Sequence, residues 1–157
     1  MLTSLRTTGL LPLLAIATIG CATAPAAGPT GQLTGAPSAR HAVEQFLASV
    51  RAQDIQAMSV VWGTSRGPTR DTMDRNELER RAIILQCFLA HDQFRIVSEV
   101  AGEGPRRIIA VAITRGNQTR QPSFHIVPGP SQRWYVENID LASVRDFCGG
   151  VTNPSGG

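Results

Sequence analysis

The segment that decides the fold runs from residue 92 to residue 114, with the sequence DQFRIVSEVAGEGPRRIIAVAIT. Apolar and polar residues alternate from Phe94 to Val100, and a turn rich in glycine follows. Residues 107–114 then form a nearly continuous apolar run. Alternation with a period of two predicts a half-buried strand, and a continuous apolar run of this length predicts a central one. The segment therefore predicts two neighbouring antiparallel strands.

Two more strands are expected after this pair. Gly116-Asn117 is typical of a tight hairpin turn. Residues 119–127 predict a third strand, interrupted by a proline that indicates an edge or a bulge. Residues 133–139 predict the fourth strand, after which Asp140 is expected to cap a short helix over residues 141–147. The second half of the domain is therefore predicted to be a four-stranded antiparallel meander.

Three helices are expected before the strands. Ser38 is a suitable N-cap for the first, Asp54 begins a short second helix that ends at Trp62, and a third runs from Asp74 to about His91. Residues at three-four spacing give the first helix one apolar face: Val43, Phe46, Leu47 and Val50.

The third helix is expected to begin with a capping box, in which the side chains of Asp74 and Glu77 each accept a hydrogen bond from the other residue's backbone N–H. Its central apolar stripe is widened by Ile84, Cys87 and Phe88, so contact with more than one element is expected. Residues 63–70 are predicted to be a loop with at most a short extended piece.

Helices followed by an antiparallel meander make an α+β layer arrangement. The element order resembles the NTF2-like, cone-shaped superfamily, with Phe46-Leu47 and residues 54–58 in the helical hairpin and residues 133–136 in the last strand. The resemblance implies a third helix and a helical hairpin on a curved four-stranded sheet. It also implies a cone that holds an acid/base pair in the enzymes of the class. The alternative is a cystatin-like fold with one helix across the sheet, and the helices at 39–62 count against it.

The start of the chain indicates where in the cell the protein is located. Cys21 closes the segment Thr18-Ile19-Gly20-Cys21 after an apolar run that begins near Leu10, and it resembles the lipobox of a bacterial lipoprotein. This run of about ten residues is shorter than the roughly 20 that a membrane-spanning helix needs. We therefore expect a signal peptide at 1–20 and lipidation of Cys21, which places the chain in the bacterial cell envelope, facing the periplasm or the exterior. Simple secretion by cleavage after Ala24 is the alternative.

The expected organisation after the lipidated cysteine has three parts. Residues 21–37 carry no charge and are rich in Ala, Pro and Gly, which is typical of a disordered tether. Residues 38–148 are expected to form one domain, and residues 149–157 a flexible tail.

The expected location in the cell envelope also predicts how the cysteines pair. Once Cys21 carries lipid, Cys87 and Cys148 remain, and an oxidising envelope favours a disulfide between them. Two separate buried thiols are the alternative. Neither cysteine has a second one at metal-ligand spacing, and no histidine pair stands at helical ligand spacing, so we expect no metal and no cofactor.

Charge patterning bears on the partners. All fifteen cationic residues are arginine, against twelve acids, and both signs are interspersed along the chain. A nucleic-acid binder needs a concentrated basic face. We therefore expect no nucleic-acid partner, and instead a membrane contact through the lipid with a protein partner or a second copy of the chain.

One motif suggests hydrolytic chemistry. Residues 63–67 match G-x-S-x-G, and Asp92 and His125 follow in the order of a catalytic triad. That motif requires a strained turn from a strand into a helix above a parallel sheet. Here it follows a predicted helix and runs into Pro68, so we interpret it as a coincidence.

His91 has two interpretations. It is either a general base oriented by Asp92 or a cap on the last carbonyls of its helix, a position that favours a cation, and we favour the cap.

The candidate pocket residues are Trp62, His91 and Tyr135; no catalytic residue is assigned. Two functional hypotheses follow. The first is a noncatalytic, lipid-anchored envelope module that binds a protein partner or a small apolar ligand. The second is a small NTF2-like enzyme of isomerase or dehydratase type with an acid/base pair in the cone. They differ in whether the cone encloses a pocket with ionisable groups.

Overall fold

The computed structural model describes residues 33–149 of the chain. The helices are α1 (Ala39–Ala52), α2 (Ile55–Val61) and α3 (Arg75–Phe88), with 3-10 turns η1 (Thr69–Asp71), η2 (Pro130–Gln132) and η3 (Ala142–Cys148). The strands are β1 (Gly63–Thr64), β2 (Gly67–Pro68), β3 (Gln93–Ala101), β4 (Arg107–Arg115), β5 (Gln118–Arg120), β6 (Ser123–Pro128) and β7 (Trp134–Asp140).

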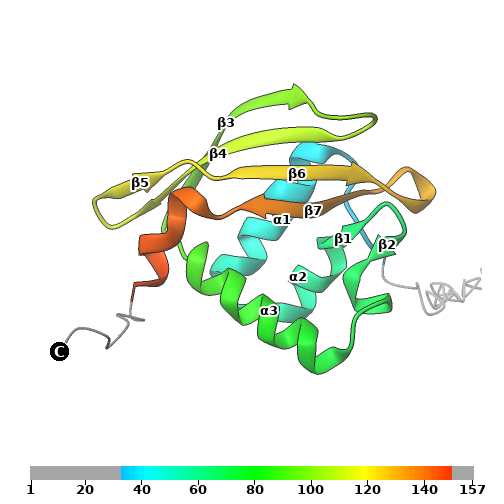
Figure 1. Cartoon of the computed structure of the whole chain (residues 1–157), viewed down its shortest axis with the longest axis horizontal. Coiled ribbons are helices and arrows are strands. Elements are labelled where there is room, and N and C mark those ends of the chain that lie inside the picture. The colour runs from blue at the N-terminus through cyan, green and yellow to red at the C-terminus, as the bar shows by residue number, and fades with distance from the viewer. Residues whose placement is uncertain (1–32, 150–157) are drawn as a thin grey trace, which may run out of the picture. The chain divides into compact units, whose positions relative to one another are not determined.

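The main sheet is antiparallel, with strand order β3-β4-β6-β7 and the short β5 paired to the end of β4. The three helices lie on one face of this sheet (Figure 1). The predicted α+β class and the antiparallel meander are confirmed. Pro122 separates β5 from β6, as its missing backbone donor predicted. The expected loop at 63–70 differs, because β1 and β2 pair within it as a small hairpin.

Helix α1 is the element that covers the sheet. Its N-cap Ser38 accepts a hydrogen bond from the His41 N–H at 3.2 Å, and Gln53 ends it in the left-handed conformation. The four apolar residues predicted for one face are all buried. The two longest helices have 14 residues each. Among residues 33–149, no helix combines the length and apolar character needed to cross a membrane.

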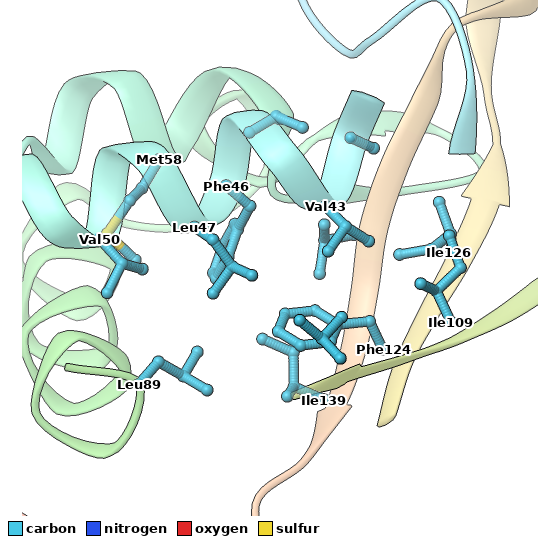
Figure 2. Packing of buried hydrophobic residues seen from close by; sticks show 14 of the residues in the cluster. Val43, Phe46, Leu47, Val50, Met58, Leu89, Ile109, Phe124, Ile126 and Ile139 are labelled. Carbon is cyan, nitrogen blue, oxygen red and sulfur yellow. The ribbon is translucent and has the colours of Figure 1, made fainter. Parts of the chain in front are cut away.

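The space between helices and sheet is filled by apolar side chains. The Phe46 ring meets Phe124 of β6 edge to face, with centroids 6.3 Å apart. Figure 2 shows helix residues facing strand residues across this layer. The fully buried set includes Val43, Phe46, Leu47, Met58, Leu89, Ile109, Phe124 and Ile126. The layer is therefore a packed core.

Helix α3 begins as predicted but with half of the expected capping box. The Asp74 carboxylate accepts from the N–H groups of Asn76 and Glu77. Glu77 does not return the bond to Asp74, because its carboxylate pairs with Arg80 and Arg81 along the helix. These two close cations offer charge-assisted hydrogen bonds in place of one neutral backbone donor.

The apolar stripe of α3 is narrower than predicted. Leu78, Ala82 and the following Leu89 are buried, whereas Ile84 is 52% exposed. The prediction that Ile84 widens the buried stripe is wrong. Helix α3 contacts α1, α2, η1 and η3, so the predicted contact with more than one element is confirmed.

The fold begins before Ser38. Ala36 is buried and exchanges two backbone hydrogen bonds with Trp134 of β7, at 2.8 and 2.9 Å. The Arg133 guanidinium donates to the carbonyls of Thr34 and Gly35. The expected tether therefore ends earlier than Pro37: Thr34, Gly35 and Ala36 are hydrogen-bonded to the domain, and Ala36 bridges Trp134 at the sheet edge. The signal peptide, Cys21, the rest of the tether and the tail from residue 150 lie outside the described residues.

The last element is a 3-10 turn where we predicted an α-helix. The Asp140 carboxylate accepts from the Ala142 N–H at 2.9 Å, so the predicted cap is present. The turn is tied to the sheet by Arg115, which donates to the Phe147 carbonyl, and by an ion pair between Arg120 and Asp146. Such short, externally held segments suit the tighter i→i+3 bonding.

The core assignment gives a stability prediction. Leu47→Ala should lower the free energy of unfolding by about 2–5 kcal/mol, because it removes buried contacts and leaves a cavity. The matched control, Ile84→Ala on the exposed side of α3, should change it by less than about 0.5 kcal/mol. Urea unfolding midpoints measure both. Equal losses in the two variants would contradict the assigned core.

Candidate functional site

A pocket of about 690 Å³ lies where the C-terminal ends of α1 and α3 meet the end of β4 and the turn η3. We call it the α1–α3–η3 pocket. Its volume falls within the range of about 300–1,000 Å³ that is usual for small-molecule sites. It is separate from the packed core of Figure 2, although Val50 and Phe147 contribute to both. The elements that line it are distant in sequence and are brought together by the fold alone.

A disulfide forms one wall of the pocket. Cys87 of α3 and Cys148 of η3 are bonded, with their Cα atoms 5.0 Å apart. The predicted pairing is confirmed in this structure. Because Arg115 and Arg120 also hold η3, this wall is fixed both covalently and by charged side chains.

His91 lies in the pocket wall and is only 7% exposed. Its Nδ1 lies 2.8 Å from the Leu89 carbonyl oxygen, and since a carbonyl only accepts, Nδ1 carries the proton. This is the contact with the helix end that we favoured. In the neutral ring Nε2 is then a lone-pair acceptor, and that atom is buried without a hydrogen-bond partner. The ring packs edge-on to Phe94.

Burial is the main cause that lowers the pKa of His91, and the nearby charge of Arg51 acts in the same direction. The Leu89 carbonyl and the charge of Asp92 oppose this shift. The expectation that His91 is a cation at the helix end is therefore wrong. The cost of desolvating an imidazolium exceeds its attraction to the helix carbonyls.

Of the other polar groups in the pocket, some have hydrogen-bond partners and some have none. The Gln86 amide nitrogen is also buried without a partner. Asp92 accepts from the Gly116 N–H at 2.8 Å, which fixes its carboxylate on the neighbouring hairpin. Arg51 forms no ion pair or side-chain hydrogen bond within the described part of the chain. The pocket thus offers the unpaired cation of Arg51, the amide donor of Gln86 and the imidazole acceptor of His91, beside the already bonded side chains of Arg115 and Asp92.

The other two candidate residues lie elsewhere. Tyr135 is buried in β7, and its hydroxyl bonds Thr34 at 3.0 Å. Trp62 is half-buried and forms a parallel backbone bridge with Val136. Neither lines the α1–α3–η3 pocket. Of the three pocket candidates, the fold brings only His91 to it.

The G-x-S-x-G match has a packing explanation. A Cβ on Gly63 would lie 2.4 Å from the Gly67 carbonyl oxygen and 2.7 Å from the Tyr135 ring, and Gly67 has φ of +122°. Both glycines are required where the β1–β2 hairpin closes over Tyr135. Asp92 lines the α1–α3–η3 pocket, whereas Ser65 and His125 of β6 do not, so the apparent triad is not assembled there.

Part of this site could be predicted from the sequence. It singled out His91 and the two cysteines, but Gln86 and Arg51 resemble solvated helix residues in the sequence. Only the convergence of α1 with α3 reveals them. Among residues 33–149, no three His, Cys, Asp or Glu side chains gather in a way that could hold a metal ion.

Comparisons with known proteins give little further information. No family model matches the chain, and no curated protein matches it. The chain is similar to an NTF2-like protein of unknown function from Cytophaga hutchinsonii, with 15% identity, 66% of this chain and 90% of that chain covered, and a TM-score of 0.34. At this level the likeness adds nothing to the α+β class, which rests on the observed elements and their order.

The disulfide should contribute measurably to stability. Cys87 and Cys148 are 61 residues apart, so the double variant Cys87→Ala/Cys148→Ala should lose roughly 4 kcal/mol of unfolding free energy in the chain-entropy model. Reduction of the wild-type chain should cause a similar loss, and reduction of the variant none. Complete alkylation of both cysteines in the native, unreduced protein would refute the bond.

The lowered pKa of His91 predicts loss of stability in acid. Above about pH 6.5 the residue is neutral in both the folded and unfolded chain, and its contribution is fully present. As the pH falls from there toward the lowered folded pKa, the unfolded state binds the proton more readily and stability is lost. The drop in unfolding free energy between pH 7.5 and 5.5 should be smaller in His91→Gln. Identical drops in the two proteins would contradict the assignment.

Proposed function

We propose that this chain is a lipid-anchored module of the bacterial cell envelope that binds a partner or small ligand without catalysing a reaction. The observation that carries the proposal is the filled layer between helices and sheet. Phe46, Leu47 and Phe124 occupy the space in which the NTF2-like resemblance would place an acid/base pair. A packed apolar core gives a substrate no access to such a pair.

The bonding of the ionisable groups also supports a binding role. A general base is usually oriented by a second group that stabilises its charged form. The Leu89 carbonyl orients His91, but Asp92, the carboxylate that could stabilise its charged form by a hydrogen bond, accepts from the Gly116 N–H instead, and burial lowers the pKa of the imidazole. The pocket therefore presents fixed donors and acceptors in a rigid wall, an arrangement suited to recognition.

The proposed anchor rests on the sequence around Cys21. Since residues 33–37 belong to the fold, the proposed linker shortens to residues 22–32. A flexible chain of this length spans about 17–20 Å, from roughly 5–6 Å × √n. This reach would keep the domain near the membrane surface while allowing it to turn toward a partner.

Fractionation tests the anchor. Cys21→Ser should move the protein out of the membrane fraction or leave the signal unprocessed, because the acylated thiol is lost. The matched control is Cys87→Ala/Cys148→Ala, which keeps Cys21 and should stay with the membranes. A Cys21→Ser protein that still floats with membranes at the mature mass would show that lipidation is not the anchor.

A further inference from the structure

We propose that the α1–α3–η3 pocket binds a small amphipathic carboxylate, with the acid group at Arg51 and Gln86 and the apolar body along the wall that Ile83 and the disulfide form. This inference deepens the proposed binding role and rests on it. It concerns the ligand class alone and is independent of how the chain is anchored.

The position of the ligand's acid group follows from the pocket side chains that have no hydrogen-bond or ion-pair partner. Two cations line the pocket, Arg51 and Arg115, and neither forms an ion pair among the described residues. The Arg115 guanidinium already donates to the Phe147 carbonyl, whereas Arg51 has no side-chain hydrogen bond in that part of the chain, so Arg51 is the one left to receive an acid group. The Gln86 amide nitrogen is a buried donor with no acceptor. A carboxylate accepts from both kinds of donor, and charge-assisted bonds of this type are the stronger ones. A bound acid group would therefore satisfy the amide and pair the cation.

The position of the ligand's apolar body follows from the exposed apolar side chains of the pocket. Ile83 of α3 is 57% exposed on the same helix side that presents Cys87 to the pocket. Val50, Ala90 and Phe147 complete an apolar lining beside the disulfide. Covering Ile83 with a hydrocarbon chain removes apolar surface from water, at about 25 cal/mol per Å². A ligand with a charge alone would leave this wall exposed.

His91 makes binding dependent on pH. Its neutral Nε2 is an acceptor and cannot bond a carboxylate, but the protonated ring can. The charged groups around it are Arg51 from α1, Asp92 after α3 and Arg115 from β4. A bound anion offsets the repulsion from Arg51 and so favours proton uptake. Affinity should therefore rise as the pH falls from 8 to 6, a range in which a carboxylic acid stays ionised.

The test is calorimetric titration of the full chain carrying Cys21→Ser with three ten-carbon probes: decanoate, decanol and decyltrimethylammonium. Decanoate should bind with one site per chain, and more tightly at pH 6 than at pH 8. Decanol should bind about tenfold more weakly or not at all, because it lacks the charge for Arg51. The cationic probe should not bind.

Variants locate the site. Arg51→Leu should weaken decanoate binding by about tenfold or more, and Gln86→Leu by several-fold. The matched control is Arg40→Leu, an exposed arginine in the first turn of the same helix, which should bind as the wild type does. His91→Gln should remove the pH dependence. Thermal unfolding of each variant checks that it is folded. If His91→Gln does not fold, Arg51→Leu still tests whether the pocket recognises the carboxylate.

Three results would overturn the inference. Equal affinities for decanoate and decanol would exclude recognition of the carboxylate. Equal weakening by Arg51→Leu and Arg40→Leu would indicate a diffuse charge effect. Absence of saturable decanoate binding at both pH values would exclude the ligand class, and it would leave the Cys21 anchoring result unaffected.

Discussion

The contact between α1 and the sheet is the interaction on which the rest of the structure depends. Phe46 packs edge-on against Phe124, Val43 and Leu47 belong to the same buried cluster, and α1 contacts β4, β6 and β7 (Figure 2). This packing fixes the direction of α1, and so it fixes where the helix ends. The same helix carries Val50 inward and Arg51 outward at its last turn, so the core contact also places one wall of the α1–α3–η3 pocket. A change in the core would therefore be felt at the site.

The pocket retains two buried polar atoms without partners, on Gln86 and His91. Leaving such a group unsatisfied costs about 1–3 kcal/mol, a large share of the stability of a domain this size. The neighbouring groups show that the chain does satisfy its polar atoms where it can, since Asp92, Arg115 and the imidazole Nδ1 all find backbone partners. The two exceptions share one concave surface. A bound ligand that bonds these two atoms would remove the energetic cost of leaving them unsatisfied.

The edge strand of the sheet carries features that oppose pairing with another chain. Strand β3 is an edge, and a bulge interrupts its pairing with β4 between Ile96 and Ser98. Arg95 and Glu99 stand on either side of the bulge and are both exposed. Bulges and charged side chains are common means of preventing an edge strand from pairing with another chain. The exposed valines of this strand therefore do not make it a simple docking edge, which directs attention to the pocket.

Local patterns in the sequence determined most of the architecture. The switch from three-four spacing to alternation placed the helices before the strands, Ser38 and Asp54 marked helix starts, and Pro122 marked the break between β5 and β6. The even cysteine count anticipated the disulfide. Tertiary structure decided the rest, because exposure depends on which neighbours cover a residue. Ile84 looked buried and is exposed, while the uncharged stretch at Ala36 looked free and is paired to β7. The lowered pKa of His91 depends on its burial, and the presence of Arg51 and Gln86 in one pocket depends on how α1 and α3 are placed. No local pattern in the sequence encodes either property.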